Sequence, residues 1–463
     1  MPPLLALFLW LILLLALWRF DPARDSKTSV ALWVPLIWMF IVGSRLPSQW
    51  LGWQVGSTAQ ALAEGNSLDA ITYSVLILLA IGILKSRSFM WRSLFAGNLV
   101  LTAFLIFELF SVLWSDFPFI SFKRWFRDLG GYLVILVVLS DPRPRQAVST
   151  LLRRLCYLLI PLCVLLTKYY SGMSISYDEW TGAAEFMGAT TSKNMLGVLC
   201  LVSGLFFFWD TVTRWSGRKE PRTKRIILVN ASFIYMTLWL LAKSHSATSQ
   251  VCLAVGCLVI AVAHTEAVKR HPGLLTTLIP LGICVYLVLS FGFGIDITAL
   301  VAQAVGRDPT LTGRTKIWQV LLSMHTNPLV GTGYESFWLG PRLQWVWERT
   351  GSNTEAHNGF LEVYLNLGSI GLLLIVGFLI SSYRTICRRL SPFSNLGSLS
   401  LALWTVLLFR NATEASFRSG LLWLTFLLVA IVVPKGTSAR KVSLAKGSSF
   451  EKSPFELREV TTV

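Results

Sequence analysis

The sequence is poor in charged residues, which make up only 14% of its 463 positions, whereas 54% are apolar. Soluble proteins carry about 25% charged residues, so this composition argues against a water-soluble globular domain. The charges that are present are unbalanced, with 41 Lys and Arg against 24 Asp and Glu and a formal net charge of +17. Such an excess is typical of nucleic-acid binders, of proteins attracted to anionic lipid, and of membrane proteins oriented by charged loops.

Paired cysteines and internal repeats are missing as well. The seven cysteines include no Cys-x-x-Cys pair, and six lie inside apolar runs. They are therefore interpreted as small core side chains, not as a disulfide frame or a metal site. The two halves of the chain do not mirror each other, which argues against a transporter built from repeats.

Long apolar runs are abundant. A helix of about 20 apolar residues crosses the hydrocarbon core of a bilayer, and thirteen runs, several of them short, predict 12 or 13 transmembrane helices. The first run lacks a basic region before it and a cleavage site after it, which favours an anchor helix over a removed signal peptide. We therefore expect an all-α polytopic membrane bundle. The runs are 4–18, 30–44, 71–84, 94–114, 129–140, 155–170, 194–209, 226–241, 248–264, 274–292, 360–383, 396–409 and 421–433.

The basic residues alternate between successive loops. One set of loops, with the tail after Pro434, holds 27 basic and 9 acidic residues, whereas the rest of the chain holds 14 and 15. By the positive-inside rule the first set is cytoplasmic, the N-terminus is periplasmic and the C-terminus is cytoplasmic. Because the excess is divided among short loops and a tail, it does not indicate nucleic-acid binding.

This topology predicts three parts. Residues 1–114 form N-terminal membrane helices, and residues 115–433 form a membrane core that includes a large extracytoplasmic loop at 293–356. Residues 434–463 are rich in Ser, Lys and Glu and are expected to be a disordered cytoplasmic tail.

Several cations on the predicted outer face are not needed for orientation. If their segment is helical, Lys123, Arg124 and Arg127 lie within one turn of each other while Phe122 and Trp125 rest in lipid. This pattern fits either a grip on a lipid-linked phosphate or an interfacial anchor.

Two further outer segments carry cations beside helix ends. Lys193 lies near a helix N-terminus, where the helix dipole disfavours a cation, so it either binds a ligand anion or snorkels to water. Lys243 and His245 share a short outer turn and form a plausible contact for an anion or a sugar.

The large loop and its surroundings hold the remaining outer-face residues. Arg314 opens an amphipathic segment that continues to Met324, and its planar guanidinium suits phosphate. His357, beside Asn358, lies where the loop meets the next membrane helix, and a neutral imidazole there can take a proton from a sugar hydroxyl. Packing alone is the competing interpretation for both.

Near the outer end of a late helix, Arg410 and Glu414 are spaced i,i+4. Ionisable residues are expensive inside lipid, so this pair is either functional or structural.

Taken in order, these segments resemble the O-antigen ligase/polymerase superfamily, and most closely its Wzy-type exopolysaccharide polymerase branch. The resemblance runs from about Ser115 to Val433. The family often has His before the Lys-Asn pair, whereas this chain has Ser192, so any role of that histidine is absent or moved to His245. The matching features are Lys193-Asn194 at a helix start, Thr312-Gly-Arg-Thr-x-Ile-Trp318, Pro328-Leu-Val-Gly-x-Gly333, His357-Asn358 before an apolar helix, and Arg410-Asn-Ala-Thr-Glu414.

The resemblance implies a GT-C-like, inverting glycosyltransferase of the bacterial inner membrane that needs neither metal nor cofactor. Its donor would be an oligosaccharide on undecaprenyl pyrophosphate, and its acceptor a sugar hydroxyl on a second lipid-linked repeat unit. We expect His357 and Arg314 to be catalytic, with His357 activating or orienting the acceptor. The substrate-binding residues are expected to be Lys193, Asn194, Lys243, His245, Arg124, Arg127, Arg410, Glu414 and Asn358.

Other expected partners are membrane lipids, a chain-length regulator and polysaccharide export proteins. Three alternatives stay open: a ligase that transfers a finished glycan to lipid A core or protein, a transporter of lipid-linked sugars, and a membrane scaffold without catalysis. The scaffold does not explain Arg314, His357 and Arg410 together.

Overall fold

The computed structural model describes residues 1–19, 21–22, 28–53, 65–87, 90–177, 182–271, 273–287, 314–351, 353–390 and 396–433. The first part of the predicted large loop and the predicted tail lie outside the described residues.

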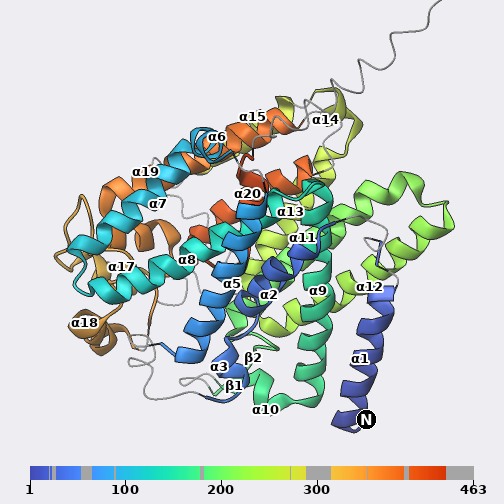
Figure 1. Cartoon of the computed structure of the whole chain (residues 1–463), viewed down its shortest axis with the longest axis horizontal. Coiled ribbons are helices and arrows are strands. Elements are labelled where there is room, and N and C mark those ends of the chain that lie inside the picture. Colours follow the sequence, from blue (N-terminus) through green and yellow to red (C-terminus); the bar gives the residue numbers. More distant parts are fainter. Residues whose placement is uncertain are drawn as a thin grey trace, which may run out of the picture.

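Helices account for nearly all of the described chain, and each of the thirteen apolar runs falls within or overlaps a helix (Figure 1). The first half of the chain forms α1 (Pro3–Arg19), η1 (Val30–Leu32), α2 (Trp33–Val42), α3 (Pro47–Trp50), α5 (Ser67–Ser86), α6 (Trp91–Gly97), α7 (Leu99–Ser111), η2 (Val112–Trp114), α8 (Pro118–Leu139), α9 (Pro144–Tyr169), α10 (Ser171–Ser174), β1 (Ile175–Tyr177), β2 (Ala184–Phe186), α11 (Lys193–Arg214) and η3 (Trp215–Gly217).

The second half continues with α12 (Pro221–Ser244), α13 (Ala247–Ala263), α14 (Glu266–Arg270), α15 (Gly273–Leu287), α17 (Arg314–Leu322), α18 (Gly340–Thr350), α19 (Gly359–Arg389), α20 (Gly397–Asn411) and α21 (Leu421–Ala430).

The multi-pass membrane class is confirmed, although the lengths of the helices differ from the expected 12 or 13 full spans. By length and apolar composition, five of the described helices are able to cross a bilayer: α5, α9, α11, α12 and α19. Helices α6 and α7 pass this test only as a pair, and a bend of 97° separates them, so they form a broken span or a re-entrant loop. Other apolar runs form shorter helices, namely α1, α2, α13 and α21.

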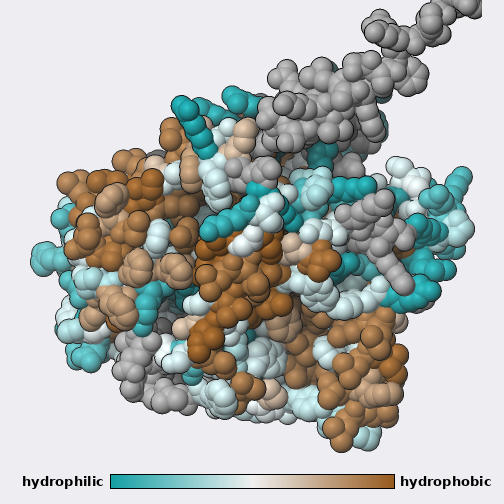
Figure 2. Space-filling view, in the orientation of Figure 1, coloured by the Kyte–Doolittle hydropathy of each residue, from teal (hydrophilic) through white to brown (hydrophobic). Residues whose placement is uncertain are grey.

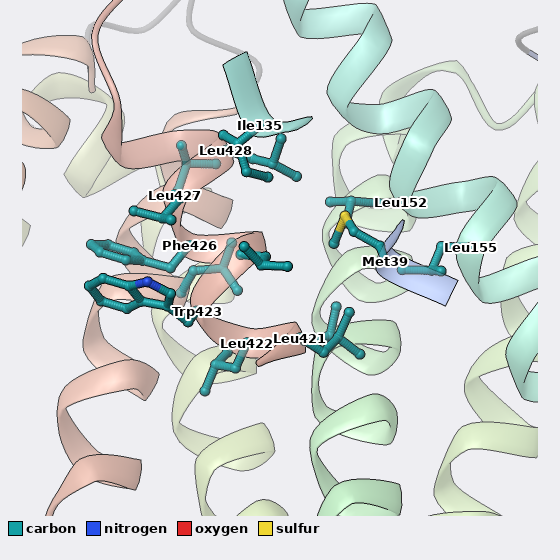
Figure 3. Close-up of a cluster of buried hydrophobic side chains, with 14 of the residues drawn as sticks. Met39, Ile135, Leu152, Leu155, Leu421, Leu422, Trp423, Phe426, Leu427 and Leu428 are labelled. Atoms are coloured by element: carbon teal, nitrogen blue, oxygen red, sulfur yellow. The ribbon is translucent and has the colours of Figure 1, made fainter. Parts of the chain in front are cut away.

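The shortness of α21 has a physical explanation in its burial. All ten residues of α21 are buried. Leu421 lies on the side of Met39 of α2, whereas Trp423 and Phe426 lie on the opposite side (Figure 3), where their rings contact Phe378. A helix enclosed by other helices does not need the length that crosses lipid on its own.

The outward-facing helices expose apolar side chains instead. Leu4 of α1 is 79% exposed and Leu78 of α5 is 68% exposed, and Figure 2 shows apolar side chains gathered over both helices. Patches of this size on a soluble protein would mark an interaction surface, and here they fit contact with lipid.

A two-stranded hairpin accompanies the helices. Strands β1 and β2 pair antiparallel, with Ile175 opposite Phe186. The hairpin lies between α10 and the neighbouring ends of α11 and α12 (Figure 1).

A break in α19 fixes the loop that follows α17. Gly368 has a φ of +64° inside α19, which interrupts the hydrogen bonds of the helix. Backbone groups next to this break form hydrogen bonds with the loop instead. Gly333 N–H donates to the carbonyl of Asn366 at 2.9 Å, and Ser369 N–H donates to the carbonyl of Pro328 at 2.9 Å. A side chain at Gly368 would meet the Leu329 backbone at 2.3 Å. The Pro328–Gly333 motif is therefore the segment that docks into this break.

The close packing of α8 yields a stability prediction. A Cβ at Gly130 would lie 2.5 Å from the Trp38 indole and 2.6 Å from the Ile77 side chain, whereas a Cβ at Gly82 of α5 meets nothing within 4 Å. We predict that Gly130→Ala destabilises the fold by about 1–3 kcal/mol, because overpacking forces neighbouring helices apart. Gly82→Ala should leave stability unchanged or slightly raised. Thermal unfolding of the detergent-purified variants measures the difference, and equal midpoints would contradict it.

Candidate functional site

A cavity of about 1020 Å³ opens beside α5 and α8, and the loops around α19 and α20 close its other side. It brings together residues from segments that are far apart in sequence. The polar residues along its wall include Arg124, Arg127, Asn194, Glu335, Glu355, His357, Arg410, Glu414 and Arg418.

An ion pair joins the start of α17 to the turn after α20. The Nη2 atom of Arg314 lies 2.8 Å from Oε1 of Glu414, whose side chain is only 5% exposed. Glu414 is held in place by its own N–H, which donates to the carbonyl of Arg410 at 2.8 Å. The pair thus links the outer loop to the membrane core.

The apolar residues of the Arg314 motif position this pair. Ile317 and Leu321 of α17 are buried in a small core with Phe337. The indole Nε1 of Trp318 donates to the carbonyl of Ala356 at 2.8 Å. The segment that carries Arg314 is therefore fastened directly beside the residue that precedes His357.

His357 lies between two carboxylates. Its Nδ1 atom is 3.1 Å from Oε1 of Glu355 and 3.5 Å from Oε2 of Glu414. Burial alone would lower the pKa of the imidazole, but the two carboxylates outweigh burial and raise it to about 9. The two carboxylates therefore favour the imidazolium over the neutral imidazole.

The residues after His357 explain why it meets Glu414. The Oδ1 atom of Asn358 caps α19 by accepting from Phe360 N–H and Leu361 N–H, both at 3.0 Å. A Cβ at Gly359 would lie 1.9 Å from Oδ1 of Asn411, so only glycine lets α19 begin against the end of α20.

Asn194 completes the surroundings of Glu414. It lies in the first turn of α11, and its Nδ2 atom is 3.4 Å from each oxygen of that carboxylate. Ser192, at the position where the family often has histidine, is the N-cap of α11 and accepts from Met195 N–H at 3.2 Å.

The structure places Lys193, Lys243 and His245 apart from the cavity wall. Lys193 forms an ion pair with Glu185 of β2, and the Lys243 ammonium lies 5.3 Å from the ring centroid of Phe186. His245 is the left-handed C-cap of α12. The first two thus contact the hairpin, and none of the three lines the described cavity.

Arg410 is buried but does not form the ion pair that its spacing allows. Its Nε atom donates to Ser416 Oγ and its Nη1 atom to Ser249 Oγ, both at 3.0 Å. Glu414 is instead contacted by Arg314 and His357, so the i,i+4 pairing with Arg410 is not formed. The charge of Arg410 still acts at a distance. Burial alone would raise the pKa of Glu414, but His357, Arg410 and Arg314 lower it below its ordinary value.

A second charged cluster on the same cavity was missed by the sequence interpretation. The Nε atom of Arg418 lies 3.4 Å from Oε1 of Glu335, and its Nη2 atom binds Oε1 of Glu362. Glu362 also accepts from Trp338 Nε1 at 2.6 Å and from Ala356 N–H at 2.9 Å. In the sequence, Arg418 looks like an ordinary loop cation, because its partners Glu335 and Glu362 are distant along the chain and come near it only in the folded structure.

The two arginines of α8 belong to this end of the cavity. Arg124 contacts Glu335, with 3.9 Å between Nη1 and the carboxylate, and Arg127 lies 3.0 Å from Asp128. The hydroxyl of Tyr334 donates to the other oxygen of Asp128 at 2.6 Å. Arg124 and Arg127 thus line the same cavity as His357; the sequence predicted that they share a helical turn, not that they meet this histidine.

One group in the described chain has metal-like donor spacing. Ligand atoms of Glu355, His357 and Glu414 lie within 4.8 Å of one another. Arg314 already occupies one oxygen of Glu414, and the two carboxylates favour the protonated form of His357, so a cation would have to displace both Arg314 and that proton.

Comparison with known proteins agrees with the motifs. Residues 231–376 match the family model described as O-antigen ligase. The chain is also similar to the exopolysaccharide production protein ExoQ of Rhizobium meliloti (strain 1021), with 26% identity over 313 residues that cover 64% of this chain and 67% of that protein. The matched family segment contains Arg314, the Pro328–Gly333 loop and His357. The predicted resemblance is confirmed.

The environment of His357 predicts a pH-dependent stability. In the folded protein the imidazole stays charged up to a pKa of about 9, against 6.5 for its ordinary value. Its stabilisation is thus complete below pH 6.5 and is lost as pH rises through 9, at most on the order of 3 kcal/mol. Thermal unfolding midpoints of the purified protein should fall over this interval. His357→Gln should remove most of the fall, whereas the exposed His325→Gln should keep it. An unchanged pH slope in His357→Gln would refute this assignment.

Proposed function

We propose, from the premise that this chain is a multi-pass membrane protein of the O-antigen ligase family, that it polymerises lipid-linked oligosaccharide repeat units into exopolysaccharide. Membership of that family implies glycosyl transfer from a lipid-linked glycan, and the similarity to an exopolysaccharide production protein supports the polymer product. The observation that carries the proposal is the meeting of Arg314 and His357 on the carboxylate of Glu414, where His357 and Glu414 line the cavity and Arg314 lies behind them.

The proposed reaction transfers a glycan from undecaprenyl pyrophosphate to a sugar hydroxyl of a second lipid-linked unit. Pyrophosphate is already a good leaving group, so a covalent nucleophile is not required. The departing charge needs fixed cations, and Arg314 and Arg410 supply them next to the carboxylate of Glu414. A single in-line displacement inverts the anomeric carbon.

The protonation of His357 supports an orienting role over that of a base. An imidazolium has no acceptor atom for the proton of a hydroxyl. It donates a hydrogen bond instead, so His357 orients the acceptor sugar or a phosphate oxygen. Asn358 caps the start of α19 and so positions His357, and Asn194 at the start of α11 contacts the Glu414 carboxylate.

The opposite end of the cavity supports a lipid-linked substrate. Arg124, Arg127 and Lys123 follow the N-terminal half of α8, and the wall beside them includes Phe119 and Phe122. Phe119 is 72% exposed. Cations beside exposed aromatic rings suit a phosphate at the membrane interface with its lipid chain below.

The hairpin cations require an exchange of partners. Lys193 and Lys243 are proposed to bind pyrophosphate only after the hairpin side chains Glu185 and Phe186 release them. His245 shares this position at the end of α12, and its sugar contact rests on the same movement.

We also propose that the cavity faces the periplasm of the bacterial inner membrane, with the N-terminus on that side and the C-terminus in the cytoplasm. The charge alternation of the loops supports this orientation. The division into residues 1–114, 115–433 and 434–463 is proposed on the same ground.

A ligase is the second candidate, because the family description is that of a ligase. Such an enzyme would join a finished glycan to a different acceptor. Deletion of the gene distinguishes the two: single-repeat products indicate a polymerase, whereas long unattached chains indicate a ligase.

The role of Arg314 gives a direct activity prediction. Loss of one cation from the leaving-group site should lower elongation about 100- to 1000-fold in Arg314→Ala. The assay uses protein in liposomes with lipid-linked repeat units prepared from a deletion strain, and it reads polymer length. Arg349→Ala of α18 removes an exposed arginine and should elongate as the wild type does. Normal polymer from Arg314→Ala, at equal protein level, would remove Arg314 from the site.

Metal independence is a separate prediction. Because Arg314 and the protonated His357 disfavour a cation beside Glu414, elongation should be the same in EDTA as in added Mg²⁺ or Mn²⁺. The measurement is the rate in the same liposome assay after chelation. A loss that added metal restores would make Glu355, His357 and Glu414 metal ligands.

A further inference from the structure

Glu414 is a cavity carboxylate that side chains from three segments contact. Its carboxylate receives Arg314 at 2.8 Å from α17, His357 at 3.5 Å from the loop before α19, and Asn194 at 3.4 Å from α11. Its side chain is nearly inaccessible to bulk water, yet the residue lines the cavity. Three segments thus converge on one carboxylate at the place where the substrates would meet.

We infer that Glu414 is the general base that takes the proton from the acceptor hydroxyl, an inference that rests on the proposed function and deepens it. Carboxylate bases need a position within hydrogen-bond reach of the attacking hydroxyl. Glu414 has that position on the cavity wall, between the arginine that faces the leaving group and the histidine that orients the acceptor.

Two neighbouring carboxylates suit this role less well. Glu362 accepts from Trp338, Ala356 and Arg418, and it is not among the residues that line the cavity. Glu335 lies between Arg124 and Arg418. In the part of the chain that the structure describes, neither is paired with Arg314 or His357, whereas Glu414 contacts both.

Glu355 is the strongest alternative candidate for the base, because its Oε1 atom lies 3.1 Å from Nδ1 of His357. Its side chain is 28% exposed, against 5% for Glu414. A base in a site that excludes water limits the competing hydrolysis of the glycosyl donor. Glu414, the more enclosed of the two, also contacts Arg314. Binding of a donor to Arg314 would therefore change the contacts of Glu414 directly.

That contact couples donor binding to basicity. A donor pyrophosphate competes with Glu414 for Arg314, because both are anions that bind the guanidinium fork. When Arg314 turns to the phosphate, Oε1 of Glu414 loses its closest partner, keeps the 3.4 Å contact to Asn194 and becomes open to a hydroxyl. Loss of that cation also raises the pKa of the carboxylate, so the base strengthens only when a donor is present.

The proposed step balances as follows. The acceptor oxygen forms its bond to the anomeric carbon as the bond from that carbon to the pyrophosphate oxygen breaks, and this oxygen keeps the electron pair. The hydroxyl proton moves to Oε1 of Glu414. It then passes to the departing lipid pyrophosphate or to water, which restores the carboxylate for the next cycle.

The test compares three glutamate-to-glutamine variants in the liposome assay. A general base contributes about 100- to 10,000-fold, so Glu414→Gln should lose at least 100-fold in kcat while the KM for the lipid-linked donor changes little. Glu355→Gln should lose less than about tenfold. Glu348→Gln, an exposed change on α18, serves as the matched control and should behave as the wild type.

Two further measurements separate chemistry from folding. Undecaprenyl pyrophosphate should raise the thermal unfolding midpoint of Glu414→Gln as it does that of the wild type, because Arg314 is still present to bind it. The wild-type rate should fall toward acid pH as the carboxylate becomes protonated, and the residual rate of Glu414→Gln should lack this acid limb. Glu414→Asp should restore part of the rate with the limb present.

Several results would overturn the inference. They are a Glu414→Gln rate within tenfold of wild type, a larger loss in Glu355→Gln, or an acid limb that persists without the carboxylate. Loss of lipid pyrophosphate binding in Glu414→Gln, without rescue by Asp, would instead assign it a purely structural role. Failure of the proposed function itself looks different, because then the wild-type protein elongates nothing.

Discussion

The ion pair between Arg314 and Glu414 is the interaction on which the rest of the site depends. Two charges removed from water cost several kcal/mol each, and they persist only where geometry and further hydrogen bonds compensate. Here Asn194, His357 and the nearby Arg410 supply that compensation around Glu414. The starts of α11, α17 and α19 and the end of α20 are therefore fixed relative to one another by one buried carboxylate.

The break in α19 fixes the loop that follows α17, and this loop carries further residues of the site. The Pro328–Gly333 segment takes over hydrogen bonds that an unbroken helix would keep for itself. This docking holds the Glu335 side chain beside Arg418, while Trp338 Nε1 donates to Glu362 at 2.6 Å. Backbone hydrogen bonds to α19 thus hold this irregular segment in a fixed position, which a functional site requires of the residues it uses. The segment can therefore position charged side chains although it is not a helix.

The sequence predicted the helices well because apolar runs report directly on lipid contact and core packing. It also identified Arg314, His357 and Glu414, whose charges have no orienting role. It did not predict which charges meet, because Arg314 and Glu414 lie 100 residues apart. Arg418 escaped notice for the same reason. The i,i+4 spacing to Arg410 suggested a local partner for Glu414, but the helix ends at Asn411 and turns that carboxylate toward α17.

The cavity is close to neutral in spite of the strongly basic chain. Its wall carries Lys123, Arg124, Arg127, Arg410 and Arg418 against Asp69, Asp128, Glu335, Glu355 and Glu414. In the proposed reaction, a pyrophosphate would compete with carboxylates such as Glu414 and Glu335 for their arginines, so part of its attraction would be offset by the separation of existing pairs. Release of a lipid pyrophosphate product would be favoured for the same reason, because each carboxylate would regain its arginine. A purely cationic site would hold such a product more tightly, which would slow repeated elongation.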